Sequence, residues 1–137
     1  MGFSWAPLGL ARYANPVSVE QIIQDFPKLK VIIAHFGWPW ILESVMLALK
    51  YANVYLDTSI NITGTSAESL RRVLGEQVGL ENFERRLRYQ TLFGSNYPRE
   101  DIKRVAKSLR ELGLSSRTEA CIFGGNAIKI LGRQEGA

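Results

Sequence analysis

The side chains best suited to chemistry in this sequence stand directly after short apolar runs. They are His35, Asp57, Ser95 and Asn96. Imidazole, carboxylate, hydroxyl and carboxamide groups bind substrates, ligate metals or move protons. The preceding runs are short and rich in Val, Ile, Leu or Phe, which is typical of buried strands. Because parallel α/β sheets place chemistry at the carboxyl ends of their strands, we predict a functional site where these side chains meet.

His35 is the only histidine of the 137 residues and the leading candidate. It ends the apolar run 31–34, and Phe36 and Gly37 then turn the chain before Pro39 opens a helical pattern. From the residues alone, a histidine that serves packing is the favoured interpretation. The family resemblance described below reverses that preference and favours a site residue.

Two interpretations stay open for several other residues. Asp57 and Ser59 can shape a pocket, and they can equally form a turn or cap a helix. Asn96 can be a site residue or a turn residue. For Trp38 and Trp40, packing of a helix onto the sheet is favoured over a role as a pocket wall.

The pattern of apolar residues predicts the elements that position these side chains. Strands are expected at about 30–34, 53–57 and 90–94, after an irregular N-terminal arm at 1–16. Strands this short, joined by helices, are most simply arranged as a parallel sheet with right-handed crossovers. We therefore predict an α/β fold with about three parallel strands, in a single domain over residues 1–137. Ser18, Thr65 and Asn126 are expected to cap helices, which should lie at about 18–26, 39–51, 66–74, 80–87, 98–113, 116–123 and 127–131.

The composition is that of an ordinary globular protein, with 46% hydrophobic and 22% charged residues. The single cysteine, Cys121, excludes an intrachain disulfide and a multi-cysteine zinc site, and it fits a reducing compartment. No apolar run approaches the roughly 20 residues of a membrane span, and the first residues lack the pattern of a signal peptide. We therefore predict a cytoplasmic protein without a membrane partner.

The net charge of +4 raises the question of a nucleic-acid partner. The basic residues are interleaved with acidic ones along the predicted helices, as expected of solvated helical faces. No helix-turn-helix, zinc-finger or aromatic RNA-binding signature accompanies them. Nucleic acid is therefore the least favoured partner.

Four stretches of the chain resemble the amidohydrolase-2 family of metal-dependent hydrolases and decarboxylases. They are residues 26–37, 53–59, 92–98 and 125–127, and their order along nearly the whole chain agrees with the family. The resemblance implies a TIM-type (β/α)8 barrel of about twice this length, of which this chain carries strands six to eight. In that family a His-x-His on strand one, a histidine on strand five and an aspartate on strand eight hold a divalent metal, for which zinc is the expected identity; for this chain, a site without metal is the open alternative. The metal activates a water, and the strand-six histidine polarises the substrate or binds a second metal.

The resemblance assigns His35 to the strand-six histidine, as a catalytic residue and metal ligand, and Asn96 to the strand-eight aspartate. Two departures follow. The chain has no His-x-His and no second histidine, and the carboxamide of Asn96 cannot accept a proton as a base at neutral pH. One histidine and one amide fall short of the roughly three protein ligands of a catalytic metal. The resemblance also implies substrate contacts from Gly37, Trp38, Asp57 and Ser95.

Two functions are compatible with these residues. The first is an amidohydrolase-type, metal-dependent hydrolase fragment for a small molecule, weak or inactive alone. The second is a catalytically silent scaffold or interaction module that self-associates. Three parallel strands leave two open edges, with Val31, Ile33, Tyr55 and Leu92 expected to face solvent. We therefore expect a homo-oligomer, or a partner chain that covers the open barrel edge.

Overall fold

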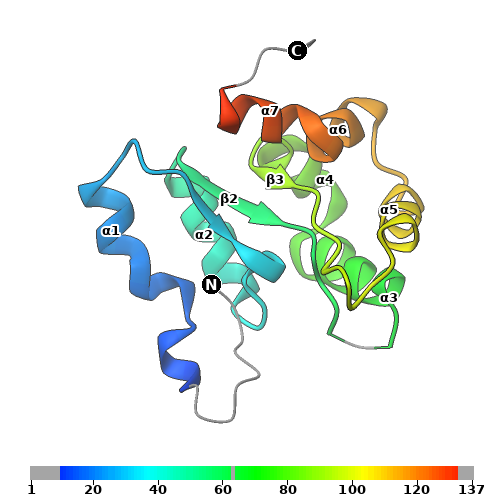
Figure 1. The fold of residues 1–137 in the computed structure, drawn as a ribbon, viewed down its shortest axis with the longest axis horizontal. Coiled ribbons are helices and arrows are strands. Elements are labelled where there is room, and N and C mark those ends of the chain that lie inside the picture. Colours follow the sequence, from blue (N-terminus) through cyan, green and yellow to red (C-terminus); the bar gives the residue numbers. More distant parts are fainter. Residues whose placement is uncertain (1–9, 63, 133–137) are drawn as a thin grey trace.

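The computed structural model describes residues 10–62 and 64–132. Three parallel strands form one sheet in the order β1-β2-β3 (Figure 1). They are β1 Val31–Ile33, β2 Val54–Asp57 and β3 Thr91–Leu92. Ile33 lies opposite Leu56, and Leu56 lies opposite Thr91. The predicted α/β fold with parallel strands is confirmed, although each strand is shorter than expected.

Helical segments connect the strands and cover the sheet (Figure 1). Several α-helices continue into turns with wider or tighter hydrogen bonding, which are labelled η. The segments are η1 Ala11–Tyr13, η2 Pro16–Val19, α1 Glu20–Asp25, η3 Ala34–Gly37, α2 Ile41–Lys50, α3 Ser66–Leu70, η4 Arg71–Val78, α4 Leu80–Asn82, η5 Phe83–Leu87, α5 Ile102–Arg110, α6 Ser116–Ala120, η6 Cys121–Gly125 and α7 Asn126–Leu131.

Side-chain caps determine where the helices begin. Thr65 and Glu68 form the predicted capping box at the start of α3. At the first long helical segment, Asn15 is the cap and Ser18 is not, because Asn15 Oδ1 accepts a 2.9 Å hydrogen bond from the N–H of Val17. Asparagine and serine side chains both accept hydrogen bonds well at a helix N-cap, so the residue type alone does not show which of the two caps the helix.

Two later helix starts also differ from the prediction. α5 begins after Asp101, whose carboxylate caps it, and not at Pro98. The expected break at Gly124 is present, since this residue has a non-helical backbone between α6 and α7. Asn126 does not cap the helix that follows but is the first residue of α7, where it is buried. Its amide donates 2.7 Å hydrogen bonds to the carbonyls of Arg88 and Thr91. Asn126 therefore ties the last helix to β3.

The expectation that Val31, Ile33, Tyr55 and Leu92 face solvent is wrong for three of them, because Ile33 is 0% exposed and Tyr55 and Leu92 are each 8% exposed. Ile33 shares the helix-covered face of the sheet with its cross-strand partner Leu56. The two-residue period of a strand places Ile32 on the opposite face, where it is 46% exposed. Leu92 is covered because β3 packs against η6 and α7.

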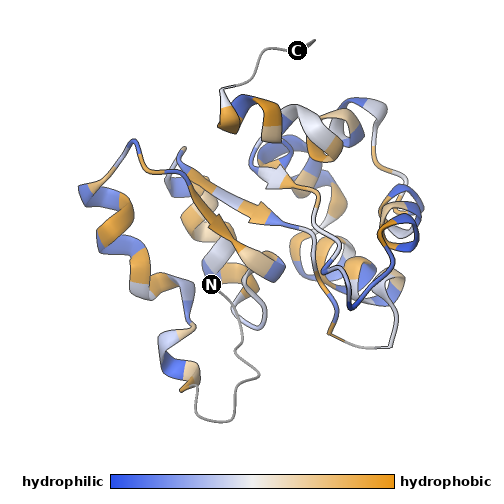
Figure 2. Ribbon diagram, viewed as in Figure 1, coloured by the Kyte–Doolittle hydropathy of each residue, from blue (hydrophilic) through white to orange (hydrophobic). Residues whose placement is uncertain are grey.

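The helix-covered face of the sheet forms the main core. β1 is hydrophobic along its whole length (Figure 2), and α2 packs against β2 from this side. The aromatic rings of Phe36 and Phe83 meet in this core with their centroids 6.2 Å apart. Since Phe36 directly follows His35, packing of this ring anchors the turn that carries the histidine.

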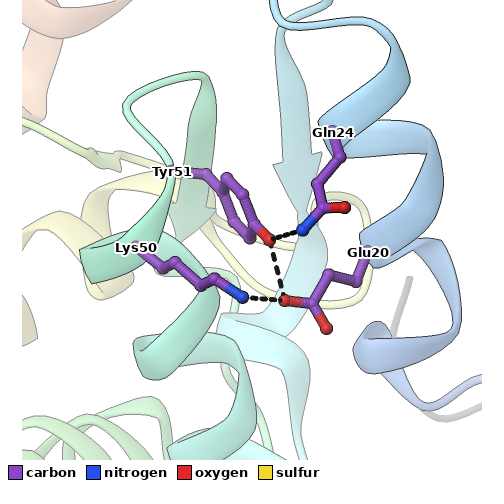
Figure 3. Close-up of polar contacts among 4 residues, drawn as sticks. All are labelled: Glu20, Gln24, Lys50 and Tyr51. Atoms are coloured by element: carbon purple, nitrogen blue, oxygen red, sulfur yellow. Dashed lines mark hydrogen bonds and ion pairs between the residues drawn. The ribbon is translucent and has the colours of Figure 1, made fainter.

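A polar cluster joins α1 to the carboxyl end of α2 (Figure 3). Glu20 Oε1 accepts hydrogen bonds from Lys50 Nζ at 2.7 Å and from the Tyr51 hydroxyl at 2.9 Å, and Gln24 donates to that hydroxyl at 2.7 Å. The hydrogen bonds from Lys50 and Tyr51 hold the pKa of Glu20 below its ordinary value. The same contact with Glu20 raises the pKa of Lys50.

Candidate functional site

A tight backbone turn presents His35 at the end of β1. His35, Phe36 and Gly37 all adopt left-handed conformations, with φ of 57°, 54° and 74°. Consecutive non-glycine residues in this region are strained and need support from their surroundings. Packing of the buried Phe36 ring supplies part of this support. At Gly37 a Cβ atom would lie 1.7 Å from Ser44 Oγ on α2, so this position requires glycine.

The carboxyl end of β2 and the residues directly after it hold His35 by its backbone and by its ring. Asp57 Oδ1 accepts a 2.9 Å hydrogen bond from the His35 N–H. The ring Nδ1 lies 2.8 Å from the Ser59 carbonyl and 2.9 Å from Ser59 Oγ. Asp57 Oδ1 also accepts from the N–H of Ser59 at 3.0 Å and from its hydroxyl. Asp57, Ser59 and His35 therefore form one hydrogen-bonded unit, which we call the His35 support.

The His35 support determines which ring nitrogen carries the proton. A backbone carbonyl can only accept a hydrogen bond, so Nδ1 must be the donor to Ser59. The Ser59 hydroxyl can accept from Nδ1 because its own proton goes to Asp57. In neutral imidazole, Nε2 then has a free lone pair. Among residues 10–62 and 64–132, no hydrogen bond involves Nε2.

The carboxyl ends of β2 and β3 are joined beside this unit. The Thr58 hydroxyl accepts a 3.0 Å hydrogen bond from the N–H of Gly94 and donates to its carbonyl at 3.2 Å. A Cβ atom on Gly94 would lie 3.1 Å from Ser59 Cβ and 3.2 Å from Asp57 Cγ. Glycine thus allows β3 to approach the His35 support closely. Sequence reasoning did not single out Gly94, whose signal was a glycine at the end of the predicted strand 90–94, since glycine within a strand can mark a close approach of another backbone.

A pocket of about 170 Å³ opens at these strand ends. His35, Trp38 and Asn96 contribute to it, so three of the predicted site residues come together there. Asn61 and Arg99, which sequence reasoning did not single out, add a carboxamide and a guanidinium. Only the fold reveals them, because both lie in polar loops with no distinguishing pattern. The remaining wall residues are Ile60 and Ile62.

The other predicted substrate contacts do not line this pocket. Asp57 is hydrogen-bonded to His35 within the His35 support, and Gly37 belongs to the left-handed turn after β1. The hydroxyl of Ser95 accepts a 3.3 Å hydrogen bond from the N–H of Tyr97, within the turn after β3. Asn96 has a φ of 63° within the turn after β3, and the residue also lines the pocket. Asparagine tolerates this conformation better than most residues.

The side chains present do not fit a complete metal site. Among residues 10–62 and 64–132, no group of three or more His, Cys, Asp or Glu side chains could hold a metal ion. The pocket offers one imidazole nitrogen and the neutral carboxamides of Asn61 and Asn96 but no carboxylate or second imidazole, whereas a catalytic metal needs about three strong protein ligands. The Oδ1 atom of Asp57 already accepts three hydrogen bonds from His35 and Ser59.

No helix within the described part of the chain is long and apolar enough to cross a membrane.

Comparison with known proteins supports the fold and the family resemblance. A family model described as Amidohydrolase matches residues 6–133. Among solved structures, an uncharacterized TIM-barrel protein from Bordetella bronchiseptica is similar, with 26% sequence identity and a TM-score of 0.75. The match covers 96% of this chain and 43% of that protein, so the chain spans less than half the length of this barrel. No curated protein matches the chain.

Proposed function

This chain belongs to the amidohydrolase family, and we propose that its pocket at the strand ends forms one side of a small-molecule hydrolase site. The observation that carries the proposal is the His35 support. Three hydrogen bonds to Asp57 and Ser59 fix the backbone and the ring of His35. Such support around a functional side chain is the arrangement that catalytic and ligand-binding histidines need.

We assign His35 the role of binding the substrate and polarising an O–H or N–H bond of it, because the free Nε2 accepts a hydrogen bond and cannot donate one to a carbonyl. Its Nε2 lone pair accepts a hydrogen bond or binds an electrophile, while Asp57 and Ser59 keep the ring in place. Arg99 supplies positive charge at the rim of the pocket, and Trp38 supplies an apolar wall. Asn96 can orient a substrate through its amide, but it cannot take up the proton that hydrolysis releases from water.

The proposed site is incomplete within the described residues. The family is generally metal-dependent, and a bound divalent metal would supply an activated water. Of the residues here, only His35 could donate a strong ligand. We therefore propose that hydrolysis by this chain alone is weak or absent, and that further ligands come from another chain. A cytoplasmic location stays a prediction from the single cysteine.

A catalytically silent scaffold is the second candidate. The neutral Asn96 at the position of the family's base, together with the absence of a metal cluster among the described residues, favours it. In that case the His35 support would survive as part of the turn after β1, and the pocket would have no catalytic role.

Metal content and zinc titration distinguish the two candidates. The variants are wild type, His35→Ala and Asn96→Asp, with Asn82→Asp on the exposed surface of α4 as the control for added charge. If the hydrolase proposal is right, zinc binds the wild type, is lost in His35→Ala and binds Asn96→Asp more tightly, while Asn82→Asp behaves as wild type. Absence of zinc binding in wild type and Asn96→Asp alike would establish the scaffold instead.

A further inference from the structure

α2 has two apolar faces, and only one of them is used by the fold. Ile41, Leu47 and Ala48 are buried against the rest of the molecule. On the other side of the helix, the side chains of Leu42, Met46 and Leu49 are 65%, 41% and 48% exposed. Their spacing of four and then three residues aligns them in one stripe. We call these three residues the α2 stripe.

The α2 stripe points away from the sheet. With about 100° of rotation per residue, it lies opposite the helix side that carries Leu47 and Ala48. Strands that extended the sheet beyond β1 or β3 would add to its edges and would leave this outer helix surface uncovered. The α2 stripe therefore needs an explanation separate from the open barrel edges.

Two shallow hollows flank the α2 stripe and share Leu42 and Gln77 in their walls. One, of about 610 Å³, lies at the amino end of α2, and the other, of about 360 Å³, lies between α2 and the η4–η5 segments. Their walls are mainly apolar. Together with the α2 stripe they form a continuous apolar surface of ridges and grooves, which is the form that helix–helix packing requires.

We propose that a second copy of this chain occupies this surface, with the two α2 helices packed antiparallel about a two-fold axis near Met46. In this arrangement Leu42 of each copy meets Leu49 of the other, because the α2 stripe is symmetric about its middle. The same surface patch is then used by both copies, as in most homodimers.

Charge complementarity selects a second copy over other occupants. Glu43 and Lys50 lie on the same flank of the α2 stripe, seven residues apart on the helix. An antiparallel two-fold pairing brings Glu43 of one copy beside Lys50 of the other, and it does so twice. The Lys50 side chain is 52% exposed even while it contacts Glu20, so its ammonium group can serve both carboxylates.

Light scattering across a concentration series provides the first test. Wild type is expected to dimerise, and Met46→Asp should weaken the dimer by about tenfold or more, because it places two carboxylates at the two-fold axis. The control is Ile102→Asp on α5, which is 48% exposed and should leave the dimer unchanged. Circular dichroism verifies that the variants fold. A monomeric wild type, or a dimer that Met46→Asp leaves intact, would overturn the proposal.

Disulfide cross-linking tests the geometry directly, in a Cys121→Ser background that removes the native thiol. A mixture of Leu42→Cys and Leu49→Cys copies should cross-link on mild oxidation. Neither variant should cross-link by itself, because in the antiparallel dimer the two equivalent positions are about 10 Å apart along the helix. Cross-linking of each variant with itself, or no cross-link in the mixture, would contradict the antiparallel dimer. Neither experiment depends on metal binding or activity, so its result is independent of the proposed function.

Discussion

Residues at the carboxyl end of β2 fix both the backbone and the ring of His35. Asp57 Oδ1 accepts a hydrogen bond from the His35 backbone N–H, and the carbonyl of Ser59 accepts one from ring Nδ1. The carbonyl of Ser59 is the decisive partner, since it can only accept. The hydrogen-bond partners of His35 therefore determine which ring nitrogen carries the proton in the neutral imidazole, without reference to any ligand.

The neutral imidazole of His35 is expected to carry its proton on Nδ1. Nitrogen-15 NMR can measure this directly, because the chain has one histidine and its ring signals need no assignment. Ser59→Ala removes the hydroxyl but keeps the carbonyl, so the Nδ1–H form should persist in that variant. A ring that carries its proton mainly on Nε2 in wild type would contradict the hydrogen bonding described for the His35 support.

Gly37→Ala should destabilise the protein by about 2 kcal/mol or more, because it adds a left-handed alanine and a clash with Ser44. Urea unfolding measures the loss. Adding Ser44→Ala removes the contact with Oγ but leaves the Cβ of residue 44 at 2.7 Å, so it should recover only part of the loss. Gly75→Ala in η4 is the matched control: its Cβ would lie 3.8 Å from Arg71 Cγ, an ordinary contact, so a gain of roughly 0.5–1 kcal/mol is expected.

At the scale of elements, the link between α1 and α2 makes stability depend on pH. The folded pKa of Glu20 lies below its ordinary value of 4.5, because Lys50 and Tyr51 donate hydrogen bonds to the carboxylate. This contribution is fully present above pH 4.5 and is lost as the pH falls through the lowered folded pKa. The pair is exposed, so the effect is small and sensitive to salt.

Glu20→Gln should therefore be less stable than wild type at neutral pH, and the difference should shrink as the pH falls below 4.5. Urea unfolding at several pH values down to 3 measures it. Glu81→Gln on α4 is the control, since the structure gives this exposed carboxylate no ion pair within the described residues. A constant difference between wild type and Glu20→Gln at all these pH values would exclude the proposed linkage.

The positions of helices and strands were predictable where residues close in sequence determine them. The apolar runs located all three strands, and Thr65 with Glu68 located the start of α3. Asn126 was misassigned because a cap and a buried amide use the same residue type. Its two carbonyl partners, at Arg88 and Thr91, are distant in sequence and leave no local signal. The same holds for Arg99 and Asn61 in the pocket.

At the scale of the whole molecule, one sheet face is covered by helices and the other retains an exposed isoleucine. Adjacent residues of β1 distinguish the two faces, because Ile33 is 0% exposed and Ile32 is 46% exposed. Ile33→Ala should cost about 3 kcal/mol of unfolding free energy, and Ile32→Ala about 1 kcal/mol or less. Chemical denaturation of both variants decides this, and equal losses would contradict the assignment of the faces.

The barrel character was predictable from the whole chain, because four stretches in a fixed order carried the family resemblance. The direction of individual strand side chains was not. A run of apolar residues in β1 has no alternation, so Ile32 and Ile33 cannot be assigned to faces from sequence. Only the pairing with β2 assigns them.

The parallel pairing of the strands has a consequence for how the chain folds. Val31 pairs with Val54, and Leu56 pairs with Thr91, so every pairing spans an intervening helical segment. No hairpin exists within the described residues to start the sheet. Long stretches of chain must therefore be closed before the first strand–strand hydrogen bond can form. We expect the helices to form early and the sheet late, so that apolar strands are transiently exposed during synthesis and refolding.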